Sequence, residues 1–253
     1  MMSIFERSAK NERWIVLAGL ALVVIAGLLT TLLVGDRLMM AAMAGGSGTL
    51  TYLVLLFIMW WTMMMAMMLP SAAPAILTYA AINRKLEDGT GAAARLTAFV
   101  SGYLLIWTGF ALAIVMLQFL LEPKIELSMM MAVVSAAIGG GLLVAAGVYQ
   151  MSPLKSTCLR KCQTPLLYFT HHWKKGSVGA FNMGLSHGLY CVGCCWVLMG
   201  LLFYGGVMEL RWIVGLALYV ALEKLSPAGS LISRFTGIVL IGWGIWILTQ
   251  ALS

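Results

Sequence analysis

Several uninterrupted apolar segments constrain the fold of this chain more than any other feature of its sequence. A helix needs roughly 20 apolar residues to cross a bilayer, and several segments reach that length. None of them alternates polar and apolar residues with the period of two that barrel strands require. Only helices and closed barrels satisfy every backbone hydrogen bond in lipid. The chain is therefore predicted to be an all-α, polytopic transmembrane helical bundle.

The composition supports this prediction. Hydrophobic residues make up 62% of the chain and charged residues 10%, whereas a soluble domain carries about a quarter charged residues. The net charge of +7 would suggest nucleic-acid binding in a soluble protein. Here the charges fall between the apolar segments, so they are interpreted as determinants of membrane topology, and no nucleic-acid partner is expected.

About seven helices are expected, within a single transmembrane domain over residues 1–253. The sixth is short, and six helices result if it forms a hairpin with the fifth at Gly205 and Gly206. The first apolar run follows a basic start like that of a signal peptide, but it is too long and lacks a small-residue cleavage site, so it is interpreted as a retained helix. The predicted spans are 14–34, 50–69, 96–121, 129–149, 182–204, 208–222 and 233–251.

The basic residues predict an orientation. With the N-terminus in the cytoplasm, thirteen lysines and arginines lie inside and three outside, which is a strong positive-inside bias. We expect a multi-pass protein of the cell membrane, of the bacterial inner-membrane type, with a cytoplasmic loop over 150–181. The inside set is Arg7, Lys10, Arg13, Arg84, Lys85, Arg95, Lys155, Arg160, Lys161, Lys174, Lys175, Lys224 and Arg234; the outside set is Arg37, Lys124 and Arg211.

The second predicted helix is rich in methionine. Six of the ten residues from 59 to 68 are Met, and thioether sulfur is a soft ligand that suits Cu(I) and poorly suits Mg²⁺ or Ca²⁺. Met is also a flexible apolar filler of cores, and that alternative stays open. Pro70 and Pro74 are expected to break or kink the helix. The candidate metal ligands in this segment are Met63, Met64, Met67 and Met68.

A cysteine-rich segment lies in the fifth predicted helix. His187, Cys191 and Cys194 have the spacing i, i+4 and i+7, which places them on one helix face, and Cys195 borders that face. Thiolate and imidazole together select Cu(I) or Zn²⁺. The alternative is that these cysteines are small apolar packing residues and that Gly184, Gly188 and Gly193 mark close helix contacts.

Further candidates lie nearby. The 150–181 loop carries two thiols one helical turn apart and two adjacent imidazoles, which suggests a secondary, transient metal site or a redox pair, unless the loop is simply basic and solvated. Glu223 and Lys224 are expected to pair with each other at the membrane interface. The secondary candidates are Cys158, Cys162, His171 and His172.

These motifs resemble the DUF2182 family, described as predicted metal-binding integral membrane proteins. The resemblance covers most of the chain from about residue 50 onward. It rests on the stretch from Met59 to Pro74, on the loop from Tyr149 to Cys162, on the stretch from His187 to Trp196, and on Glu223-Lys224. It implies a helical membrane fold with a metal site, and some proteins of this kind are described in connection with copper handling.

Three functions remain open at this stage. The first is a protein that binds Cu(I), with zinc as the second candidate ion, and handles copper or delivers it to a copper chaperone or cuproenzyme partner. The second is a membrane thiol–disulfide oxidoreductase that uses Cys191 and Cys194, which the predicted cytoplasmic position disfavours. The third is a structural membrane subunit. No nucleotide-binding loop is found, so nothing in the sequence indicates ATP-driven pumping. No catalytic residue is assigned, and a binding protein in contact with lipid is expected in preference to an enzyme.

Overall fold

The computed structural model describes residues 50–86, 91–121 and 135–252 continuously, together with parts of 18–40. All of the described residues between 18 and 40 are helical, as the first predicted span requires. Arg7, Lys10, Arg13 and Lys124, which entered the orientation argument, lie outside the described residues.

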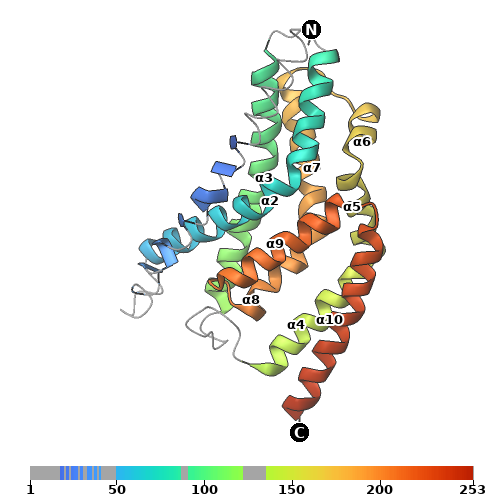
Figure 1. The fold of residues 1–253 in the computed structure, drawn as a ribbon. Helices are drawn as coiled ribbons and strands as arrows, with labels where there is room; N and C mark the ends of the chain where they lie inside the picture. The colour runs from blue at the N-terminus through green and yellow to red at the C-terminus, as the bar shows by residue number, and fades with distance from the viewer. Residues whose placement is uncertain are drawn as a thin grey trace.

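The described part of the chain is a bundle of helices, which confirms the predicted fold class (Figure 1). Among the described residues, four helical segments are long and apolar enough to cross a membrane: Leu50–Leu86, Ala92–Leu121, Gly176–Gly205 and Gly229–Ala251. A fifth arises if the pair of helices bent by 63° over residues 136–163 is counted as one span. The helices are α2 (Leu50–Leu86), α3 (Ala92–Leu121), α4 (Ala136–Gln150), α5 (Pro153–Gln163), α6 (Pro165–His171), α7 (Gly176–Gly200), α8 (Leu202–Gly205), α9 (Leu210–Leu225) and α10 (Gly229–Leu252).

The helix α2 differs from its predicted end at residue 69. It contains both Pro70 and Pro74 and continues to Leu86, over 37 residues in all. Each proline lacks the backbone N–H that would hold the helix straight, so we attribute to them the change of direction midway along α2 in Figure 1. At the bend, the carbonyl of Met68 accepts hydrogen bonds from Ser71 Oγ at 2.9 Å and from Tyr103 Oη at 3.2 Å. The prolines therefore bend α2 without ending it.

The break between α4 and α5 has a local cause. Ser152 accepts a hydrogen bond from the backbone N–H of Lys155 at 3.2 Å, and Pro153 occupies the first turn of α5. Serine at the N-cap and proline at the first helical position together start a new helix. Most of the predicted loop 150–181 is thus helical, and α5 packs against α7.

Glycines bring two pairs of helices into close contact. Along α3 and α7, a Cβ on Gly184 would collide with the backbone carbonyl of Phe99. Along α4 and α10, which run side by side in Figure 1, a Cβ on Gly147 would lie 2.6 Å from the carbonyl oxygen of Gly237. Small residues permit such approach in membrane bundles, so the packing role considered for Gly184 is confirmed.

Replacing Gly184 with alanine is expected to destabilise the bundle by about 1–3 kcal/mol, because the added methyl group must push α3 away from α7. The matched control is Gly109→Ala on α3, where an added Cβ meets nothing within 4 Å. Thermal unfolding of the purified protein in detergent measures both variants. Equal unfolding temperatures for the two would contradict the close contact.

Candidate metal site

The centre of the site is the thiol of Cys191 on α7. Its Sγ atom lies 2.9 Å from the ammonium nitrogen of Lys224 on α9 and 3.2 Å from the hydroxyl of Tyr103 on α3. Cys191 is 1% exposed and Lys224 is 5% exposed. Three helices therefore meet at one buried sulfur atom, and the ammonium of Lys224 is placed to compensate the charge of a thiolate there.

A thioether and two more thiols surround this centre. Cys195 Sγ lies 3.8 Å from Met68 Sδ on α2 and donates a hydrogen bond to the carbonyl of Cys191 at 2.9 Å. Cys194 Sγ donates to the same carbonyl at 3.1 Å, and the three thiols are close enough to interact with one another. Cys191, Cys195 and Met68 form what we call the sulfur cluster. The predicted ligands Met68, Cys191 and Cys195 are thus brought together.

The helix α5 adds two thiols at the edge of the cluster. Cys162 is half-buried, and its thiol interacts with that of Cys194. Cys158 packs against Gly193, where a Cβ would lie 2.9 Å from Cys158 Sγ. The glycine thus makes room for α5 against α7. The secondary candidates Cys158 and Cys162 lie beside the principal site. They belong to the short helix α5, within the segment 150–181 that was predicted to be a loop.

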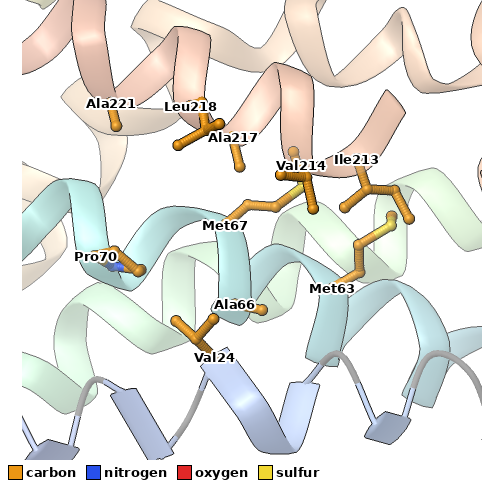
Figure 2. A pocket seen from close by; sticks show the side chains of 10 residues that line it. All are labelled: Val24, Met63, Ala66, Met67, Pro70, Ile213, Val214, Ala217, Leu218 and Ala221. Carbon is orange, nitrogen blue, oxygen red and sulfur yellow. The ribbon is translucent and has the colours of Figure 1, made fainter. Parts of the chain in front are cut away.

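Two of the other predicted methionines, Met63 and Met67, point away from the sulfur cluster. Met63 and Met67 line an apolar pocket of about 260 Å³ between α2 and α9. Figure 2 shows their side chains directed at Ile213 and Val214 of α9. Met64 is fully buried and makes no hydrogen bond to a thiol in the described part of the chain. Helix geometry separates Met63 and Met67, which share one face of α2, from Met68, which lies about 100° around the axis from Met67. Met64 is one turn before Met68 and shares its face.

The three histidines lie in different surroundings. His187 lies one helical turn before Cys191 on α7 and is close enough to Lys224 and Cys194 to interact with their charges. The imidazole of His187 is buried among aromatic rings, with ring centroids 5.9 Å from Tyr103, 6.1 Å from Phe169 and 6.2 Å from Phe99. His171 and His172 are exposed at the end of α6. The ring of His172 stacks on Tyr168, with centroids 5.0 Å apart. His187 is thus buried beside the candidate site, whereas His171 and His172 lie at the surface, and the role of all three as ligands stays a prediction.

The expected pairing of Glu223 with Lys224 is wrong. Glu223 accepts a hydrogen bond from Lys155 Nζ at 2.8 Å, in an ion pair whose two side chains are 1% and 0% exposed. Tyr219 Oη donates to the other carboxylate oxygen at 3.4 Å. Neighbouring residues on a helix project in different directions, so Glu223 and Lys224 find separate partners. Lys155 and Lys224 are buried in the bundle and do not belong to the loop charges, which leaves eleven predicted inside charges against three.

The donors of the sulfur cluster favour a soft ion. Thiolate and thioether sulfur suit Cu(I), which binds few ligands, more than hard cations. In the described ranges, no three side chains of His, Cys, Asp or Glu converge on one point in a way that would hold a metal. The thioether of Met68 supplies a third soft donor beside the thiols of Cys191 and Cys195. The residues present therefore fit a Cu(I) ion with two thiolates and one thioether better than a tetrahedral Zn²⁺ ion with four ligands.

The fold and the site define a multi-pass helical membrane protein with soft sulfur donors in its interior. The sequence model of a family described as "PpoB2: Copper chaperone" matches residues 57–247, which reach from α2 to α10. The chain belongs to this family of copper chaperones. The comparisons with curated proteins and with solved structures gave no match.

Family membership confirms the prediction of a copper-handling membrane protein, and it implies copper binding and copper-dependent partners. The DUF2182 designation and the predicted ligands remain predictions. Sequence reasoning missed Tyr103 and Ser71, and it paired Lys224 wrongly. The available signal was that Lys224 ends an apolar helix, where an ionisable side chain needs a polar partner inside the bundle.

Proposed function

We propose that this chain holds one Cu(I) ion in the sulfur cluster and passes it to a copper-dependent partner protein. The observation that supports this proposal most directly is the convergence of Cys191, Cys195 and Met68 from two helices at a buried point. Both thiols are 1% exposed and Met68 is fully buried, so an ion held there would be shielded from water and oxidants. Shielding of this kind suits a carrier, because free Cu(I) is reactive.

The test is a Cu(I) titration of the protein, purified in detergent under reducing conditions. We expect one tightly bound Cu(I) per chain in competition with a chromophoric Cu(I) chelator. X-ray absorption of the loaded protein should report sulfur-only coordination, including a longer thioether bond. Absence of stoichiometric copper, or coordination by nitrogen, would refute the proposal.

Release requires a path from the buried cluster to the surface, and the thiol of Cys162 is placed to provide one. It is half-buried and interacts with Cys194, which in turn adjoins the other thiols of α7. Cu(I) can move along such a series by exchanging one thiolate ligand for the next. We propose that Cys162 is the handover ligand between the sulfur cluster and the surface.

Replacing Cys162 with serine is expected to slow loading from a Cu(I)–glutathione donor about tenfold while changing the equilibrium affinity less than about threefold. Rates come from stopped-flow measurements, and affinities from chelator competition. The comparison variant is Cys158→Ser, one turn earlier on α5, where the sulfur contacts Gly193. If both variants load at the rate of the wild-type protein, Cys162 is not on the path.

A further inference from the structure

The ammonium group of Lys224 lies within the proposed copper site. Its Nζ atom is 2.9 Å from Cys191 Sγ, 3.9 Å from Met68 Sδ and 3.2 Å from the hydroxyl of Ser71. Two of these three atoms belong to the sulfur cluster. The side chain is nearly inaccessible to solvent, so its charge acts on the cluster through a medium of low polarity.

No carboxylate neutralises this ammonium within the part of the chain that the structure describes. The nearest carboxylate in sequence, that of Glu223, is occupied by Lys155 at 2.8 Å. The other described ion pair joins Arg211 to Glu209 near the start of α9, at the opposite end of that helix from Lys224. The positive charge of Lys224 is therefore available to be balanced by the sulfur cluster and by the ion that it holds.

From this arrangement we infer that Lys224 makes the sulfur cluster selective for a monovalent soft ion over a divalent one, that is, for Cu(I) over Zn²⁺. The inference rests on the proposed function. Cu(I) bound by two thiolates carries one net negative charge, which the ammonium cancels. Zn²⁺ bound by the same two thiolates is neutral, so the ammonium leaves one uncompensated positive charge in the interior. Because an unpaired buried charge is unfavourable, the zinc complex is destabilised relative to the Cu(I) complex.

Two classes of substitution separate charge from shape. Lys224→Gln removes the charge and keeps a hydrogen-bond donor, whereas Lys224→Arg keeps the charge. Affinities for Cu(I) and for Zn²⁺ are measured on the full-length protein in detergent by competition with chelators. We expect Lys224→Gln to lower the ratio of Cu(I) to Zn²⁺ affinity about tenfold or more, and Lys224→Arg to keep the ratio within about threefold of the wild-type value.

Lys224→Leu, a neutral and apolar replacement, tests the same point if the glutamine variant does not fold. An unchanged ratio of affinities in a neutral variant would overturn the inference. If both affinities stay at their wild-type values, the selectivity comes from ligand number; if both fall equally, Lys224 only supports the structure. These outcomes differ from a failure of the proposed function, in which the wild-type protein does not bind Cu(I) or Cys191→Ser binds it unchanged.

Discussion

Replacing Cys191 with serine is expected to weaken Cu(I) binding about 100-fold or more, because it removes a soft donor from the centre of the site. Serine has nearly the same volume and keeps a hydrogen-bonding atom beside Lys224 and Tyr103, so the packing of α3, α7 and α9 should persist. Its hydroxyl oxygen is a poor ligand for Cu(I). Chelator competition under reducing conditions measures the loss, and circular dichroism checks that the helices are retained.

The matched comparison lies on α2. Met68→Leu removes the thioether that lies 3.8 Å from Cys195 and should weaken binding about tenfold. Met63→Leu makes the same change on the face directed at α9, and its affinity should stay within about threefold of the wild-type value. If Met63→Leu weakens binding as strongly as Met68→Leu, the ion is held by the methionine stripe and the sulfur cluster is not the site.

The helical bundle was predictable because lipid leaves few alternatives for an apolar chain. The lengths of individual helices were less so. Pro70 and Pro74 suggested an end to the second helix, yet α2 continues to Leu86. At the bend, the side chains of Ser71 and Tyr103 both donate hydrogen bonds to the carbonyl of Met68. Tyr103 belongs to α3, so no pattern within the second helix could predict its hydrogen bond to Met68.

The site shows the same limit. Their spacing predicts that His187 and Cys191 share one face of α7. It does not predict that Tyr103 of α3 covers that face, with its ring near His187 and its hydroxyl at Cys191. Periodicity defines the face of a helix and leaves open which neighbouring helix fills it. The rule that adjacent helical residues diverge was sufficient to reject a pair between Glu223 and Lys224. Only the three-dimensional arrangement reveals that Lys155, on another helix, is the partner of Glu223.

Replacing Lys155 with methionine is expected to lower the free energy of unfolding by about 3–5 kcal/mol, because it leaves the carboxylate of Glu223 buried without its cation. The ion pair joins α5 to α9 at 2.8 Å. Gln163 of α5 also donates a hydrogen bond to the backbone carbonyl of Glu223 at 2.9 Å. The ion pair and this hydrogen bond together hold α5 against α9, beside the sulfur cluster. Thermal unfolding followed by tryptophan fluorescence measures the change. Reduced protection of Cys162 from alkylation should accompany it.

A double variant separates the loss of attraction between the two charges from the burial of a lone carboxylate. Lys155→Met combined with Glu223→Gln removes both charges, and we expect it to be more stable than Lys155→Met alone, since no unpaired carboxylate remains in the interior. Arg211→Met serves as the control, because its pair with Glu209 is exposed and such surface pairs add little to stability. If the double variant unfolds at the temperature of Lys155→Met, the cost lies in packing between α5 and α9. If the double variant recovers stability, the cost of Lys155→Met lies in the lone buried carboxylate of Glu223, and α5 stays beside the sulfur cluster without the ion pair.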